Sequence, residues 1–125
     1  MMEKNEITVL MVQPGKVPFV KTVISTLEGL QAEVGGDIEV TYPFEDNVGL
    51  IMNEEGKING LEYNRSLRDE NGMVYDVIAG PFMVVGLSDS DFCSLTSEQI
   101  STYMEVYRHP EAFIRSEGRL LVIPY

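Results

Sequence analysis

The sequence predicts an α+β fold, with two helices packed on a mainly antiparallel twisted sheet or partly open barrel of five to seven strands. Short runs rich in β-branched residues recur along the chain and end at turn residues, as in strands joined by tight connections. Only two segments repeat apolar residues at clear helical spacing. The 125 residues can bury one core, so we expect a single domain, 1–125, with its core over residues 7–107 and a C-terminal extension over 108–125.

The first two strands are expected to form a hairpin. Residues 7–12 are an apolar, β-branched run without polar alternation, which is typical of a strand that is central or covered on both faces. The run ends at a segment in which Pro14 followed by Gly15 matches a type II turn. Residues 18–24 should therefore return as the antiparallel partner.

A short amphipathic helix is expected next, beginning at Ser25 or Thr26. Ser25 and Glu28 have capping-box spacing, and Gly35 occupies the place of a left-handed C-cap. Residues 37–42 then alternate polar and apolar side chains, which predicts a strand with one dry face.

The stretch Gly49–Leu67 holds the densest turn signals of the chain. An apolar run, residues 49–52, enters the polar segment 53–57, and a second short run, residues 58–61, leaves it. Because glycine and asparagine suit tight turns, this spacing predicts a hairpin between the two runs.

The second half should contain two strands and a helix. Residues 73–87 follow an Asn71-Gly72 turn signal and are apolar except for Asp76, and Gly80 divides them into two strands or bends one. A helix should begin at Thr96, with Gln99 at capping-box spacing. Its apolar stripe is more typical of a core than of a binding surface, and consists of Ile100, Tyr103, Met104 and Tyr107.

The tail has two local tendencies. Residues 112–115 could form a short helix, whereas residues 120–123 are strand-like. We expect the strand-like run either to dock as a last strand or to reach a neighbouring subunit.

The net charge of −11 is unevenly distributed. Residues 28–62 contain nine acids and one base, and residues 71–107 contain five acids and no base. Such a surface repels phosphate backbones and anionic lipid, so we expect no direct contact with nucleic acid or membrane. The absence of a basic, apolar leader and of a long apolar window predicts a cytoplasmic protein.

Few residues are candidates for chemistry. The single Cys93 and the single His109 stand at opposite ends of the second predicted helix, so we expect no Cys-His nucleophile. One cysteine and one histidine are also too few for a zinc site. We expect no other metal, no cofactor and no catalytic residue. Asp76 should share a strand face with apolar residues, and we predict that Arg65 pairs with it. The alternative is that Asp76 protects an exposed strand from edge-to-edge pairing.

A ligand or partner site is predicted at the same place. Tyr63, Asn64 and Arg65 could together bind an anionic or amide group at a sheet edge, with Asp76 nearby. Polar residues after a strand also commonly serve a loop, and that interpretation stays open.

Three motifs occur in a characteristic order: Val34-Gly35-Gly36 with Ile38-Glu39, then Asn53–Lys57, then Asn64-Arg65. This arrangement resembles an uncharacterised bacterial and phage family, the domain of unknown function 3846 family, over roughly residues 7–107. The resemblance implies a small domain carried on phage or mobile elements, in some proteins near antirestriction-type domains. It implies no activity and no catalytic residues.

We favour a non-catalytic binding or regulatory module that recognises an unknown protein partner through a sheet edge or the apolar tail, with a homodimer through that tail as one form. The acidic balance suggests an alternative, a DNA-mimicking, antirestriction-type inhibitor. Duplex DNA carries one charge per ~1.7 Å, so a ~35 Å face would need on the order of twenty aligned acids. A small carboxylate-dependent hydrolase is the third hypothesis, although no spacing selects a pair of acids.

Overall fold

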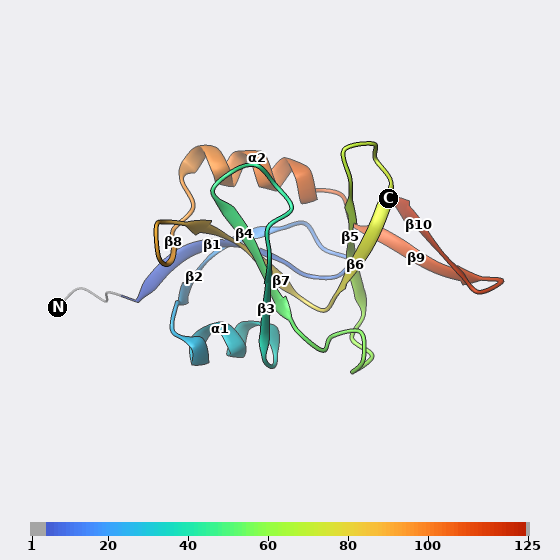
Figure 1. The fold of residues 1–125 in the computed structure, drawn as a ribbon, viewed down its shortest axis with the longest axis horizontal. Helices are drawn as coiled ribbons and strands as arrows, with labels where there is room; N and C mark the ends of the chain where they lie inside the picture. Colours follow the sequence, from blue (N-terminus) through green and yellow to red (C-terminus); the bar gives the residue numbers. More distant parts are fainter. Residues whose placement is uncertain (1–4, 125) are drawn as a thin grey trace.

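A computed structural model describes residues 5–124, which form two helices and ten strands (Figure 1). In chain order the elements are β1 (Glu6–Val12), β2 (Phe19–Ile24), α1 (Leu27–Val34), β3 (Ile38–Thr41), β4 (Val48–Asn53), β5 (Tyr63–Arg68), β6 (Val74–Ala79), β7 (Phe82–Leu87), β8 (Phe92–Cys93), α2 (Ser97–Tyr107), β9 (Glu111–Ser116) and β10 (Arg119–Pro124). Six strands form one antiparallel sheet in the order β2-β1-β7-β4-β3, with β8 beside β7. The pairs β5–β6 and β9–β10 form separate two-stranded sheets. The α+β class is confirmed, and the sheet is open rather than closed into a barrel.

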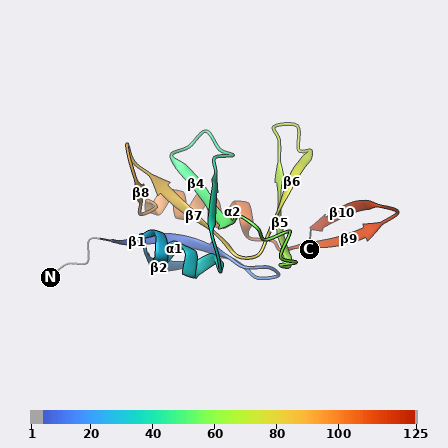
Figure 2. The same cartoon turned by 60° about the horizontal axis from the view of Figure 1, so that its bottom comes forward.

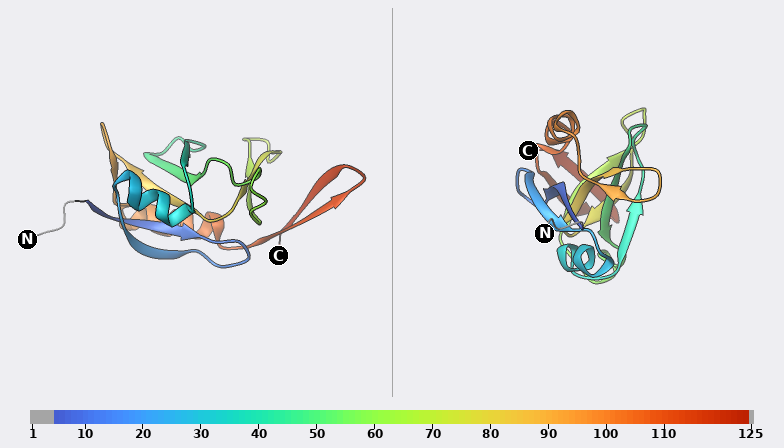
Figure 3. Two further views of the ribbon diagram at one scale, coloured as in Figure 1. Left: turned by 90° about the horizontal axis from the view of Figure 1, so that it is seen from below. Right: turned by 90° about the vertical axis from the view of Figure 1, so that its left-hand side faces the viewer.

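The main sheet lies between the two helices, which cover opposite faces (Figures 1 and 3). On one face Leu10 belongs to the cluster that contains Tyr103 of α2. On the other face Val9 belongs to the cluster that contains Leu30 of α1. Successive residues of β1 therefore enter two different cores, which explains why this strand lacks polar alternation.

The predicted first hairpin is confirmed. β1 and β2 pair antiparallel, with Ile7 opposite Val23. The turn between them places Gly15 at a φ of 73°, and the Lys16 amide donates to the Gln13 carbonyl at 3.2 Å. A positive φ at the third residue of a type II turn is the reason that glycine is favoured there.

The helix ends agree with the sequence except at one residue. Thr26, rather than Ser25, caps α1 by accepting from the Gly29 amide at 3.1 Å, so the predicted Ser25–Glu28 capping box is wrong. The Ser25 amide instead donates to Asn5 and extends the β1–β2 pairing. Gly35 is the left-handed C-cap of α1.

The second predicted helix has the expected start. Thr96 accepts from the Gln99 amide at 3.1 Å, and the Gln99 side chain accepts from the Thr96 amide at 3.0 Å. This reciprocal pair is the predicted capping box, and it satisfies two N–H groups that have no partner within the helix.

The predicted hairpin within Gly49–Leu67 is wrong. β4 pairs with β3 and β7, whereas residues 54–60 form turns. All six residues of β4 are buried, and a buried strand needs a hydrogen-bonding neighbour on both edges. A Cβ on Gly56 would lie 2.5 Å from the Ala79 carbonyl oxygen, so this turn packs closely on the end of β6.

The apolar segment that follows forms two strands, as one of the predicted alternatives states. Gly80, with a φ of 84°, separates β6 from β7, and the two strands belong to different sheets. The bend allows the chain to leave the β5–β6 hairpin and enter the middle of the main sheet.

The tail forms a β-hairpin that extends away from the rest of the molecule (Figures 2 and 3). The helix predicted at residues 112–115 is wrong, because these residues lie in β9 and pair with β10. Glu117 and Gly118 both have positive φ, at 52° and 76°, which is the geometry of a two-residue type I′ turn. The strand predicted at residues 120–123 lies within β10, although it does not join the main sheet.

Candidate functional site

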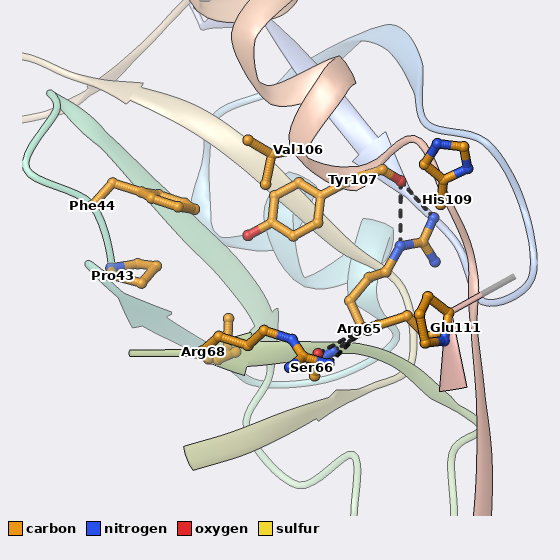
Figure 4. A pocket seen from close by; sticks show the side chains of 11 residues that line it. Pro43, Phe44, Arg65, Ser66, Arg68, Val106, Tyr107, His109 and Glu111 are labelled. Carbon is orange, nitrogen blue, oxygen red and sulfur yellow. Dashed lines mark hydrogen bonds and ion pairs between the residues drawn. The ribbon is translucent and has the colours of Figure 1, made fainter. Parts of the chain in front are cut away.

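A cavity lies where β5, the end of α2 and the base of the C-terminal hairpin meet (Figure 4). Its volume is about 290 Å³. We call it the junction pocket, and it is lined by Pro43, Phe44, residues 65–68, Val106, Tyr107, His109, Glu111 and Pro124. These residues come from four separate parts of the sequence, so the pocket exists only once the elements have packed.

Arg65 is the most unusual of these residues because it is charged and yet only 2% of its surface is exposed. Its Nε donates to the Tyr107 carbonyl at 3.3 Å, and Nη2 donates to the same oxygen at 2.8 Å and to the Lys16 carbonyl at 2.7 Å. Nη1 donates to the carbonyl and to the side-chain oxygen of Asn64 at 3.3 and 2.9 Å. Arg65 thereby caps the C-terminus of α2, where carbonyls lack helical partners and a cation is favoured.

The surroundings of Arg65 also affect its ionisation. Burial lowers the pKa of the guanidinium, and the nearby Glu111 carboxylate partly opposes that shift. The carbonyl dipoles around the group therefore stabilise a cation for which burial is unfavourable.

Asn64 completes the arrangement. Its side-chain amide donates to the Val12 and Gly80 carbonyls, both at 2.9 Å, and its oxygen accepts from Arg65. One side chain thus joins the end of β1 to the bend between β6 and β7. We refer to this pair as the Asn64–Arg65 lock.

Glu111 attaches the hairpin to β5. Its carboxylate accepts from the Ser66 amide at 2.5 Å and from the Ser66 hydroxyl at 2.8 Å. Arg68 forms a longer ion pair with it, at 3.8 Å. Because Ser66 follows Arg65 directly, β5 uses neighbouring residues to hold the helix end and the base of the hairpin.

Aromatic rings form the wall of the pocket nearest the core. The Tyr107 ring contacts Phe82 edge-on with centroids 5.2 Å apart, and Phe44 lies 6.5 Å from it. Burial raises the pKa of the Tyr107 hydroxyl.

Tyr103, which donates to Asp46 at 2.9 Å, has its pKa raised to about 12, first by burial and then by that hydrogen bond. The stripe predicted as core is confirmed at both tyrosines, which are buried.

The predicted pair between Arg65 and Asp76 is wrong. Asp76 forms an ion pair with Lys57 and is half-exposed on β6, while Arg65 donates to the carbonyls described above. The physical reason is that the Arg65 side chain lies beneath the end of α2, where backbone carbonyls accept its N–H groups. A carbonyl is neutral, so burying it beside Arg65 avoids the cost of desolvating a second ion such as the Asp76 carboxylate.

The four predicted site residues fall into two groups. Tyr63 and Asp76 line a more open groove of about 250 Å³ beside β10. The Tyr63 hydroxyl accepts from Arg115 at 2.9 Å, and its ring contacts Phe113 with centroids 5.6 Å apart. Arg65 lines the junction pocket, and Asn64 serves the lock. A role of these four residues in binding a ligand stays a prediction.

The C-terminal hairpin has two different faces. Phe113 faces Tyr63, and Leu120 lines the groove beside β6. On the opposite face Ile114 stands directly across from Leu121, with Ile123 two residues further. These three side chains, which we call the outer face, are 48%, 47% and 44% exposed.

Charge also distinguishes the hairpin from the rest of the chain. Residues 108–125 contain three arginines and two glutamates, for a net charge of +1. Residues 1–107 contain six basic and 18 acidic side chains, for a net charge of −12. Arg108 lies at the end of α2, so the hairpin itself, residues 111–124, contains two arginines and two glutamates and is a neutral, partly apolar projection on an acidic body.

Sequence reasoning missed Arg68, His109 and Glu111 as pocket residues. Glu111 lies 45 positions from its partner Ser66, and no local spacing signals such a contact. The hairpin did carry a signal, since Glu117-Gly118 stands between two short runs that contain β-branched residues.

A family model described as a domain of unknown function, DUF3846, matches residues 7–108. No curated protein and no solved structure matches the chain. The matched segment ends before β9, so the C-terminal hairpin lies beyond it. In the part of the chain that the structure describes, neither helix has the length and apolar character needed to cross a membrane.

Proposed function

The chain belongs to the family described as domain of unknown function DUF3846, and on that premise we propose a non-catalytic, regulatory binding module that recognises a protein through its C-terminal hairpin. The observation that carries this proposal is the exposed outer face. Three large aliphatic side chains stand together on a projecting two-stranded sheet and are each nearly half exposed.

The energetics of a hairpin support a partner at this face. A two-stranded sheet alone is marginally stable in water, because it buries little apolar area. The outer face leaves apolar surface exposed to water. Burying that surface against a partner would be favourable by about 25 cal/mol per Å². Contact with another protein would cover that surface and order the hairpin further.

Charge indicates the kind of partner. Beyond Glu111, whose carboxylate is held by Ser66, the hairpin carries Arg115 and Arg119 near its turn against the single Glu117, whereas the body is acidic. An acidic protein surface therefore complements it, and a second copy of this chain provides one. A homodimer in which each hairpin lies on the body of the other copy is the form we propose.

Sedimentation velocity over a range of protein concentrations tests this assembly. Wild-type protein should sediment as a concentration-dependent dimer, and Ile114→Ser and Leu121→Ser should each shift it towards the monomer. Ile58→Ser is the matched control, because Ile58 is exposed in the turns between β4 and β5 and does not belong to the hairpin. The dimer should also weaken as salt rises, since opposite charges contribute to it.

Two results would contradict the proposal. A monomer at all concentrations would remove the homodimer. A dimer that Ile114→Ser and Leu121→Ser both leave unchanged would show that the outer face does not mediate it.

A further inference from the structure

The junction pocket has the opposite charge to the chain around it. Two arginines and one glutamate line it, whereas the whole chain has a net charge of −11. Within residues 5–124 Arg65 belongs to no ion pair, and its bonds go to backbone carbonyls and to Asn64. A buried cation beside a small cavity raises the local potential, so the pocket favours an anion.

Arg68 has hydrogen-bond donors to offer such an anion. It gives one N–H to the Gly72 carbonyl at 2.9 Å, and the distance of 3.8 Å to Glu111 is longer than a charge-assisted hydrogen bond. Its side chain is partly exposed at the rim of the pocket. A guanidinium has five N–H groups, so Arg68 can still donate to a carboxylate.

Tyr107 supplies a second polar group to the lining of the pocket. The residue is only 4% exposed, and no hydrogen bond joins its hydroxyl to another group within residues 5–124. Every fully enclosed side-chain nitrogen or oxygen in the described part of the chain has a partner, so this hydroxyl opens onto the cavity. Figure 4 shows the phenol oxygen directed to the side of the pocket where Phe44 lies.

The remaining lining is apolar. Phe44, Leu67 and Val106 surround the space next to the Tyr107 ring. A cavity of about 290 Å³ is at the small end of the range for ligand sites, so it suits a group of one ring or one branched chain.

We propose that the junction pocket binds a carboxylate attached to a single aromatic or branched apolar group. The carboxylate accepts from Arg68 and from the Tyr107 hydroxyl, and the apolar group packs on Phe44 and Leu67. Glu111 lies at the same pocket and disfavours ligands of higher negative charge. Such a group can be a free organic acid or the C-terminal residue of a polypeptide. The site is separate from the outer face of the hairpin, so this inference does not rest on the proposed function.

Titration of the ¹⁵N-labelled protein tests the binding. Phenylacetate is the probe for a free acid, and phenylacetamide is its neutral control of the same shape. Phenylacetate should produce saturable shifts of the Ser66, Arg68 and Tyr107 amides, and the amide should bind about tenfold or more weakly, because it lacks the charge-assisted bond. An acetylated Gly-Gly-Phe peptide with a free carboxylate, compared with its C-terminal amide, tests the polypeptide source.

Three variants locate the site. Arg68→Gln and Tyr107→Phe should each weaken phenylacetate binding several-fold or more, while Arg119→Gln at the far end of the hairpin should leave it unchanged. Tyr107→Phe removes only the hydroxyl, so its effect does not depend on loss of the fold. Tighter binding of phenylacetate than of the peptide acid identifies a free acid as the ligand, and the reverse order identifies a chain terminus.

The proposal is overturned by the absence of saturable shifts with both acids. Equal binding of phenylacetate and phenylacetamide would also overturn it, as would an equal loss of affinity in Arg68→Gln and Arg119→Gln. Because none of these readouts reports oligomeric state, the pocket and the outer face can fail separately.

Discussion

The main sheet and the C-terminal hairpin are both antiparallel β-structure, but they are stabilised in different ways. β1, β4 and β7 each have a hydrogen-bonded neighbour on both edges, and the sheet they form has a buried cluster on each face. Each strand of the hairpin pairs with one neighbour, and its outer face is nearly half exposed. Antiparallel pairing is therefore buried in the main sheet and exposed on one face in the hairpin. The main sheet gains most of its stability from apolar side chains that are buried on both of its faces.

β5 connects these two regions. Asn64 and Arg65 direct their side chains towards β1 and the end of α2, whereas Ser66 contacts Glu111 at the base of the hairpin. If the comparison is correct, changes at the lock should destabilise the whole molecule, and changes further along the hairpin should have progressively smaller effects.

The largest effect is expected from Arg65→Met. The substitution keeps an unbranched apolar stem but removes the guanidinium, which leaves the Tyr107 and Lys16 carbonyls without their donor. At about 1–3 kcal/mol for each unpaired buried acceptor, the free energy of unfolding should fall by about 2–6 kcal/mol. Urea denaturation measures this change. Arg119→Met, at an exposed position in the hairpin, is the control and should stay within about 0.5 kcal/mol of wild type. A loss below about 1 kcal/mol at Arg65 would show that the lock is not a main source of stability.

Glu111→Gln should have an intermediate and local effect. The amide cannot accept from Ser66 as strongly as the carboxylate does, so opening at the base of the hairpin should become easier by about 1–2 kcal/mol. Hydrogen exchange of the Ser66 amide should accelerate accordingly, while amides in β1 and β7 keep their protection. Glu117→Gln in the turn is the matched control. Equal exchange rates in both variants would contradict the attachment that we assign to Glu111.

A smaller effect is expected at alkaline pH. Because folding raises the pKa of Tyr103 from 10.0 to about 12, the contribution of its neutral phenol is complete below pH 10 and is lost as the pH rises towards about 12. Tyr103→Phe should therefore reduce the decline in the free energy of unfolding over this interval. Tyr42→Phe, at an exposed tyrosine, should not. Urea denaturation at several pH values measures this decline, and tyrosinate absorbance is a second observable. An unchanged decline in Tyr103→Phe would show that the assignment is wrong.

Ile114→Ser should have the smallest effect on the stability of the monomer. Its side chain faces solvent, so the free energy of unfolding at low protein concentration should change by no more than about 0.5 kcal/mol. Ile51→Ser in β4 is the opposite case and should cost about 2–5 kcal/mol, because that side chain is fully buried. Similar losses at the two isoleucines would mean that the hairpin is as well covered as the sheet.

Local chemistry predicted much of the fold. The Pro14-Gly15 turn, the left-handed cap at Gly35 and the capping box of Thr96 with Gln99 all form as expected. Each depends on residues within four positions of one another, so the sequence contains the whole interaction. Local signals failed at the Ser25–Glu28 capping box, at the hairpin predicted within Gly49–Leu67, and at residues 112–115, where a weak helical tendency was overcome by pairing with β10.

Less of the candidate site could be predicted. The sequence identified Arg65 and Asn64 as unusual but assigned Arg65 the wrong partner, and it did not bring Arg68, His109 and Glu111 to one place. Besides the adjacent Asn64, the acceptors of Arg65 are backbone carbonyls 42 and 49 positions away. Every residue carries a backbone carbonyl, so the pattern of side chains cannot indicate which carbonyl will accept from Arg65.

The amino-acid sequence alone determined the α+β class, the ends of both helices to within one residue, the first hairpin and the acidic character of the chain, because short-range backbone geometry and side-chain chemistry suffice for these. Tertiary structure decided that β4 pairs with β7, that Arg65 lies under α2 and that the tail projects with one apolar face uncovered. These features depend on which distant segments share a core, and that choice is made by the packing of the whole chain rather than by any one stretch of it.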